Sequence, residues 1–184
     1  MASTLRPATL ADLDGIVAVF LACWRNNYVR VMPERLVSSM TTERAKTLWE
    51  PALREDAPAD GGPVVVVAAE TSGGVPAAGG GHPTVCGVTR WSLQEGQGTI
   101  HSLYVDPALQ GGGVGALLLQ AAEDGIAAAG AATATLWVFG DNTPSLAFYR
   151  RRGWAPDGVV RTSTEFGEPE VRLAKVLKEA GPAA

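Results

Sequence analysis

A loop with four glycines in five residues, set between an expected strand and an expected helix, constrains this chain more than any other feature. The loop reads Gln110-Gly111-Gly112-Gly113-Val114-Gly115-Ala116. Glycines leave backbone N–H groups accessible, and at a helix N-terminus the unpaired donors and the helix dipole point the same way. Such a position binds anions, and a phosphate or pyrophosphate is its natural ligand. A tight turn without a ligand is the structural alternative.

Two nucleotide-binding motifs can be compared with this loop. A P-loop needs Gly-Lys-Ser/Thr after the glycines, whereas Gly115 is followed here by Ala116 and Leu117. The dinucleotide fingerprint G-x-G-x-x-A is met by Gly111, Gly113 and Ala116, but it follows directly on the first strand of a β-α-β unit. Here residues 106–110 intervene and earlier strands are expected. A dinucleotide-binding oxidoreductase is therefore a less favoured interpretation of this loop than another phosphate-containing ligand.

Hydrophobic periodicity predicts alternating helices and strands around this loop. We expect strands at 5–8, 64–69, 84–93, 100–105, 133–138 and 170–177. We expect helices from Thr9 or Asp12 to residue 24, from residue 34, at 42–54 with a kink or end at Pro51, at 114–130 and at 144–152. Leu117 and Leu118 should face the core. The glycine-rich residues 71–83 predict a flexible hairpin loop. This order predicts an α/β fold, a mixed sheet with helices on both faces. We expect one domain over 1–178 and a C-terminal tail at 179–184.

Composition excludes several classes of function. The formal net charge is −4 and the pI is near 5.2, which argues against nucleic acid as a partner. Cys23 and Cys86 are far apart and form no CxxC pair, so we expect buried thiols and neither a disulfide nor a zinc site. His82 and His101 are the two histidines, which further limits metal sites, and we expect no metal.

The N-terminal apolar run is too short to be a membrane segment. It covers residues 16–23 and follows Asp12 and Asp14. A signal peptide needs a basic leading region, and a membrane span needs about 20 apolar residues. We therefore expect a cytoplasmic protein without a membrane partner. Whether it forms a homodimer is left open.

Several linked motifs resemble those of the GNAT family of N-acetyltransferases. The loop Gln110–Gly115 matches the family pattern Gln/Arg-x-x-Gly-x-Gly/Ala, and Leu103-Tyr104-Val105-Asp106-Pro107 resembles the bulged fourth strand before it. Downstream, Asn142 precedes Tyr149 by seven residues, and Gly153-Trp154 follow. The resemblance covers residues 99–154. It implies the acyl-CoA N-acyltransferase fold, a mostly antiparallel sheet of six or seven strands with a splayed fourth and fifth strand and about four helices.

The resemblance also implies a binding mode for acetyl-CoA as cosubstrate. The pyrophosphate would lie on the loop amides, and the pantetheine arm would pair with the exposed backbone of Leu103, Tyr104 and Val105, as a ligand adding a strand. Asn142 would bind the arm from the far side. A backbone N–H near Leu103 would polarise the thioester carbonyl. The implied loop residues are Gln110, Gly111, Gly112, Gly113, Val114, Gly115 and Ala116.

Tyr149 is the candidate general acid, because a phenol with a pKa of about 10 is protonated at neutral pH and can protonate the departing thiolate. The proton acceptor is less clear. Relatives keep a glutamate at the positions of Thr99 or Trp137, and neither residue is a base. His101 is a candidate, since strand periodicity places it on one face with Thr99 and Leu103, where it resembles in rough position a histidine of another acetyltransferase. A hydrogen-bonded structural histidine, or water as the base, are the alternatives.

The expected function is acetyl transfer to a primary amine of a small molecule or peptide, by direct attack in a ternary complex. Four aromatic residues could line the acceptor groove, and we expect at least two of them to pack in the core instead. They are Trp24, Tyr28, Trp49 and Trp91. A non-catalytic acyl-CoA sensor is the second hypothesis, because Thr99 and Trp137 replace the family's carboxylates.

Overall fold

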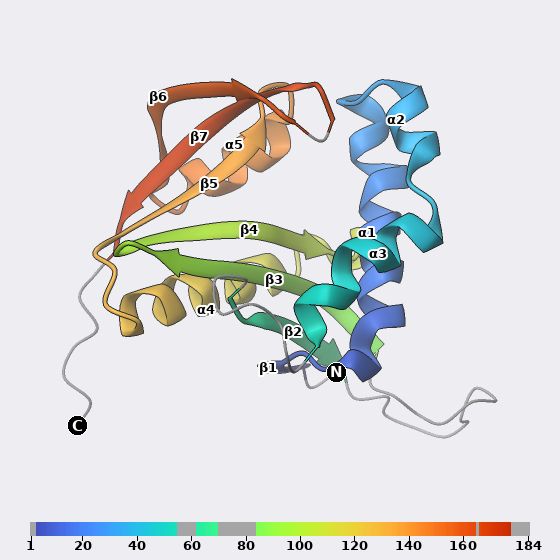
Figure 1. The fold of residues 1–184 in the computed structure, drawn as a ribbon, viewed down its shortest axis with the longest axis horizontal. Coiled ribbons are helices and arrows are strands. Elements are labelled where there is room, and N and C mark those ends of the chain that lie inside the picture. Colours follow the sequence, from blue (N-terminus) through green and yellow to red (C-terminus); the bar gives the residue numbers. More distant parts are fainter. Residues whose placement is uncertain (1–2, 55–61, 70–83, 165, 178–184) are drawn as a thin grey trace.

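One seven-stranded sheet organises the part of the chain that the computed structural model describes, residues 3–54, 62–69, 84–164 and 166–177. Its spatial order is β1-β2-β3-β4-β5-β7-β6 (Figure 1). Most neighbours are antiparallel, and β4 and β5 are parallel. The strands are β1 (Ser3–Pro7), β2 (Val64–Ala69), β3 (Thr84–Gln94), β4 (Gln97–Val105), β5 (Thr133–Phe139), β6 (Ala155–Thr162) and β7 (Pro169–Val176). This mixed α/β architecture confirms the predicted fold class.

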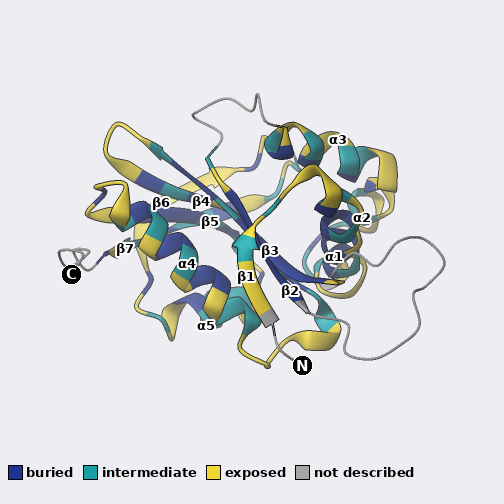
Figure 2. Ribbon diagram, turned by 90° about the horizontal axis from the view of Figure 1, so that it is seen from below, coloured by how far each residue is buried: buried dark blue, intermediate teal, exposed yellow. Residues whose placement is uncertain are grey.

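Helices cover both faces of the sheet (Figure 2). They are α1 (Leu13–Asn26), α2 (Glu34–Ser39), α3 (Thr42–Leu53), α4 (Val114–Ala128) and α5 (Thr143–Arg150). Strand β2 explains why its sequence is an unbroken apolar run. Val64 and Val66 pack with α1 and α3, whereas Val65 and Val67 pack in the clusters that contain α4. Alternate side chains of a strand face opposite sides, so a strand covered on both sides must be apolar throughout.

The sheet splits between β4 and β5. The two strands pair only over Gly98–Ile100 and Ala134–Leu136. Beyond that point they diverge toward α1, so that β1–β4 and β5–β7 form two halves (Figure 1). The divergence leaves the second half of β4 without a strand neighbour on its β5 side.

A β-bulge in β4 accompanies the split. Trp91 pairs with Ile100, but Arg90 pairs with Ser102, so His101 is the extra residue. The extra residue changes which side chains share a face, as bulges do. Leu103 packs with the clusters that contain Ile100 and Val105, next to α4. The prediction that His101 and Leu103 share a face by simple alternation was therefore wrong.

Two other details differ from the prediction. Strand β6 was missed, because Pro156, Asp157 and Gly158 read as a turn and all its residues are exposed. Leu117 is 42% exposed, whereas Leu118 and Leu119 are buried, because the apolar stripe of α4 centres on residues 118, 122 and 126. Pro51 lies inside α3, which ends two residues later. The expected loop at 71–83 and tail at 179–184 lie outside the described residues.

Candidate functional site

The glycine loop forms an open helix N-terminus. Gly111 and Gly113 have φ values of 85° and 90°, which favour glycine. Gly113 directly precedes α4, and no side chain caps that helix. Asp106, which precedes the loop, caps the short 3-10 helix Pro107–Leu109 and accepts a hydrogen bond from the Ala108 amide at 2.9 Å. The first amides of α4 therefore have the open donor geometry that an anion requires.

A cavity of about 860 Å³ lies against this loop. Its wall runs from the glycines along the end of β4 to α1 and α5. Five of the seven predicted loop residues line it, while Gly112 and Val114 do not, and Val114 packs instead beside Leu118 and Val67. The lining from the predicted set is Leu103, Tyr104, Val105, Gln110, Gly111, Gly113, Gly115, Ala116 and Asn142. We call it the coenzyme cavity.

The end of β4 is held by side chains at the coenzyme cavity. The Val105 carbonyl accepts hydrogen bonds from the Cys23 thiol and from the Gln110 amide, both at 3.2 Å. Burial raises the pKa of the Cys23 thiol to about 11, so the thiol stays protonated and can donate. Gln110 thus connects the loop to β4 within the protein. Both cysteines are free and buried, as predicted.

Asn142 and Tyr149 are positioned by α5, which Asn142 caps and which contains Tyr149. Asn142 precedes the helix, and its Oδ1 accepts from the Ser145 amide at 3.2 Å, so the amide NH₂ is the group that remains for a ligand. Tyr149 is buried, with its ring edge-on to Phe148 and Trp154 at centroid distances of 5.1 and 6.1 Å. Burial raises the pKa of its phenol, which keeps it protonated through the neutral range.

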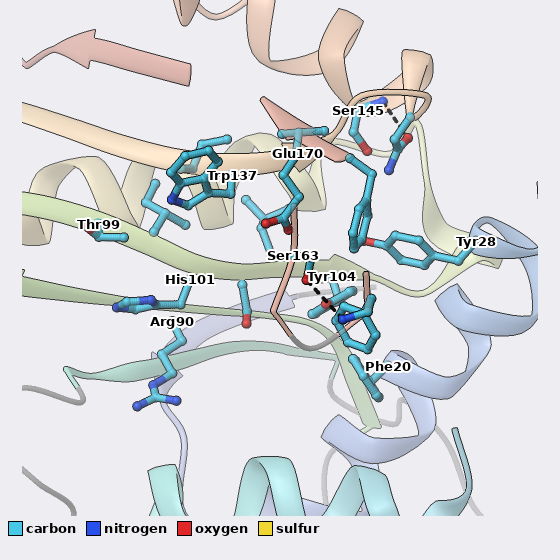
Figure 3. Close-up of a pocket in the computed structure, with 18 of the residues that line it drawn as sticks. Phe20, Tyr28, Arg90, Thr99, His101, Tyr104, Trp137, Ser145, Ser163 and Glu170 are labelled. Atoms are coloured by element: carbon cyan, nitrogen blue, oxygen red, sulfur yellow. Dashed lines mark hydrogen bonds between the residues drawn. The ribbon is translucent and has the colours of Figure 1, made fainter. Parts of the chain in front are cut away.

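A second cavity, of about 370 Å³, also has Tyr149 in its wall. Figure 3 shows this cavity, with Tyr28, His101 and Glu170 among its labelled lining residues. Its wall comes from α1, α3, β3, β4, β5, α5, β6, β7 and the connection between β6 and β7. We call it the acceptor cavity. It meets the coenzyme cavity at six shared lining residues: Tyr28, Leu103, Tyr104, Asn142, Ser145 and Tyr149. The two cavities are thus adjacent, and Tyr149 is one of the residues that they share.

His101 lines the acceptor cavity from the bulge. Its Nε2 is 2.6 Å from the Ser92 hydroxyl, a hydrogen bond that fixes the ring. Partial burial, and then the charge of Arg90, lower the pKa of His101 below its usual value of 6.5. The imidazole is therefore neutral at pH 7 and can accept a proton.

The two positions where relatives keep a glutamate line the same cavity. Thr99 lies 3.5 Å from Thr135, hydroxyl to hydroxyl. Trp137 lies under the guanidinium of Arg161, whose Cζ is 4.0 Å from the ring centroid. Sequence reasoning missed Glu170, a buried carboxylate of the same wall, because no motif precedes it.

The four candidate aromatic residues divide evenly. Tyr28 and Trp49 line the acceptor cavity. Trp24 is buried and stacks on Tyr28 at 5.2 Å, and Trp91 is buried against Gly125 of α4. Core packing for two of them is therefore confirmed. Within the described ranges, no group of three His, Cys, Asp or Glu residues could hold a metal ion, and no helix is long and apolar enough to cross a membrane.

Comparison with known proteins gives one family. The model of the Acetyltransferase (GNAT) family matches residues 30–154. A mycothiol acetyltransferase of Gordonia bronchialis is 40% identical over 73 residues, which are 40% of this chain and 23% of that protein. The chain therefore spans less than a quarter of that relative.

Solved structures share the fold at low identity. The PaiA N-acetyltransferase of Thermoplasma acidophilum, in complex with coenzyme A, has a TM-score of 0.69 and 17% identity, covering 96% of this chain and 99% of that one. The ribosomal-protein-S18-alanine N-acetyltransferase of Escherichia coli has a TM-score of 0.63 and 16% identity, covering 100% and 99%. At this identity the likeness concerns the fold.

Proposed function

The chain belongs to the GNAT family of acetyltransferases, and we propose that it moves the acetyl group of acetyl-CoA to a primary amine of a small molecule or peptide. The observation that carries this proposal is the meeting of the two cavities around Tyr149. One cavity has the open helix N-terminus that suits a pyrophosphate, and the other has an aromatic and polar wall that suits an amine. A group transfer needs both substrates in contact at one point, and this junction supplies it.

Acetyl-CoA would lie in the coenzyme cavity, with its pyrophosphate on the amides at the start of α4. Its pantetheine arm would run along Leu103, Tyr104 and Val105, where β4 has no strand neighbour on its β5 side, with the Asn142 amide on the far side. The thioester would then reach the shared residues. A backbone N–H near Leu103 is our proposed donor to the thioester carbonyl.

The amine would attack the thioester carbon from the acceptor cavity. A carbon–nitrogen bond forms, the carbonyl electrons move to oxygen, and the carbon–sulfur bond then breaks as the carbonyl re-forms. Tyr149 would give its proton to the departing thiolate, and His101 would take the proton of the nitrogen directly or through water. Both residues return to their starting states by exchange with solvent.

Two measurements test this function. The first is the melting temperature with acetyl-CoA, CoA or NAD, where we expect stabilisation by the first two only. Stabilisation by NAD alone would exclude the family's chemistry for this chain. The second follows thiol release with phenethylamine, a linear aliphatic diamine and a tripeptide amide with a free N-terminus. We expect thiol release that depends on at least one of these amines.

A non-catalytic acyl-CoA sensor is the second candidate, favoured by Thr99 and Trp137 at the positions of the missing carboxylates. The two functions separate cleanly. A sensor would bind acetyl-CoA and show the same melting shift, but no amine would increase thiol release.

A further inference from the structure

Glu170 is a buried carboxylate in the wall of the acceptor cavity. It is the second residue of β7 and pairs with Phe139 of β5 on one side and with Arg161 of β6 on the other. Only 8% of the residue is exposed. Among the described residues that line this cavity, no other is an Asp or Glu. A buried carboxylate costs solvation free energy, so one that faces a cavity calls for a functional explanation.

Arg161 fixes the orientation of this carboxylate. Its Nε donates to Glu170 Oε2 at 2.7 Å, while its guanidinium stacks on Trp137. Among the described residues, no other hydrogen bond to the Glu170 carboxylate is found, so its Oε1 is left for a ligand. Figure 3 shows the carboxylate of Glu170 pointing into the cavity, between Trp137 and Tyr28.

The carboxylate is also close to the junction of the two cavities. Tyr28 lines both cavities. Burial is the main cause that raises the pKa of the Tyr28 phenol, and the negative charge of Glu170 adds to this shift. Figure 3 shows the Glu170 carboxylate on the same side of the cavity as Tyr28, so Glu170 lies near a residue that both cavities share.

The chemistry of amine attack creates a use for a negative charge at this place. As the carbon–nitrogen bond forms, the attacking nitrogen becomes positively charged until it loses a proton. A fixed charge of opposite sign, already oriented toward that nitrogen, stabilises the transition state without reorganisation. Thr99 and Trp137, on β4 and β5, supply no charge there, and Arg90 and Arg161 would oppose the cation.

We propose that Glu170 is the acceptor-binding residue of this enzyme: Oε1 accepts a hydrogen bond from the attacking nitrogen, orients its lone pair toward the thioester and stabilises its positive charge. The inference rests on the proposed acetyl transfer. Glu170 forms no covalent bond. The nitrogen proton leaves to His101 or water, and the thiolate takes the proton of Tyr149. The acceptor is thus an amine that approaches from the β7 side, with its apolar part against Tyr28 and Trp49.

The principal test is Glu170→Gln, which keeps the shape and one carbonyl oxygen but removes the charge. With whichever amine of the panel the wild type acetylates, we expect kcat/KM for the amine to fall about 100-fold. The melting shift with acetyl-CoA should not change, because Glu170 does not line the coenzyme cavity. Glu168→Gln is the matched control, because Glu168 belongs to the same hairpin but does not line the cavity.

Arg161→Gln distinguishes the charge of Glu170 from the structural role of the Arg161–Glu170 ion pair. It breaks the same ion pair but leaves the carboxylate in the cavity, so we expect its loss to be less than tenfold. Equal losses in Arg161→Gln and Glu170→Gln would show that the pair only supports the hairpin and would overturn the proposal. So would Glu170→Gln with wild-type kcat/KM.

A binding measurement on the wild type does not depend on turnover. In the presence of CoA, phenethyltrimethylammonium is compared with its uncharged isostere, in which carbon replaces nitrogen. We expect the cation to bind at least about tenfold more tightly, and equal affinity would overturn the proposal. If no amine of the panel is acetylated, but the wild type prefers the cation and Glu170→Gln does not, the proposed acetyl transfer fails while the charge recognition by Glu170 stands.

Discussion

The two cavities that meet at Tyr149 are built in different ways. The coenzyme cavity combines one continuous segment, which runs from the bulged end of β4 through the glycine loop to the start of α4, with residues of α1 and α5. The acceptor cavity uses side chains from elements spread between α1 and β7. At the glycine loop the shape depends on where side chains are absent, whereas in the acceptor cavity it depends on which side chains are present.

The difference has a consequence for substitutions. In the coenzyme cavity, the damaging change is to add a Cβ where φ is positive, because the amide geometry then shifts. In the acceptor cavity, the damaging change is to remove one polar atom. Affinity for the coenzyme and rate with the amine should therefore respond to separate sets of variants, and residues at the junction should affect the rate most.

Tyr149→Phe should have the largest effect, because Tyr149 belongs to both cavities. We expect kcat for thiol release to fall about 1,000-fold, within the range of about 10²–10⁴ for a positioned acid. The ring packing against Phe148 and Trp154 needs no hydroxyl, so melting temperature and acetyl-CoA binding should stay close to wild type.

Phe148→Leu is the control for that variant, because it disturbs the packing of the Tyr149 ring but leaves the phenol. An unchanged rate in Tyr149→Phe would remove the phenol from the chemistry and would make the junction a binding site only.

Substitution of His101, in the acceptor cavity, should cause the second-largest loss of rate. We expect His101→Ala to lower kcat about 100-fold at saturating amine. Since the pKa of His101 is lowered by burial and by Arg90, its neutral form is available above pH 6.5, and the wild-type rate should fall only at pH below that value. The low-pH decrease should be absent from the variant.

Arg90→Gln sharpens the assignment. Removing that positive charge should raise the pKa of His101, so the decrease in rate should begin at higher pH than in the wild type. A profile that is identical in wild type and His101→Ala would leave water as the base.

The contrast between the cavities also explains what the sequence could predict. The loop Gly111–Gly115 could be interpreted because backbone donors at a helix start depend on glycine spacing and local order alone. Tyr149 and Asn142 could be placed because they lie at a fixed spacing on one short helix. Each of these signals is local, and each was found together with the others in residues 99–154.

The acceptor side depended on information that no local window contains. Glu170 reaches the cavity because β7 inserts between β5 and β6, and β6 was itself missed, since its exposed residues carry no hydrophobic period. The predicted sheet face of Leu103 was wrong because a bulge at His101 adds one residue to the strand. Such effects arise from strand order and register, which tertiary pairing decides.

Gly113→Ala should weaken acetyl-CoA binding, and this effect should be smaller than the losses of kcat in Tyr149→Phe and His101→Ala. The added Cβ meets open space, so the cost is the left-handed backbone, about 1–2 kcal/mol. If the amides move to relieve it, the Kd for acetyl-CoA should rise about tenfold, as measured by calorimetry.

Gly130→Ala is the matched control at the other end of α4. Gly130 has a φ of 92° and also open space around its Cβ position. We expect the same loss of unfolding free energy in both variants but weaker coenzyme binding in Gly113→Ala only. Equal coenzyme affinities would contradict the idea that the loop amides hold the pyrophosphate.

Gln110→Ala should have the smallest effect. It tests whether backbone amides or the Gln110 side chain bind the coenzyme. The family motif begins with this residue, yet its amide donates to Val105 at 3.2 Å, inside the protein. Losing one partly buried neutral hydrogen bond costs about 0.5–1.5 kcal/mol, so we expect acetyl-CoA affinity to fall no more than about tenfold, with kcat unchanged. Because the Cys23 thiol still donates to the same carbonyl, the end of β4 should stay in place. A loss larger than that of Gly113→Ala would mean that the Gln110 side chain binds the coenzyme directly, and the coenzyme cavity would then depend on side chains as the acceptor cavity does.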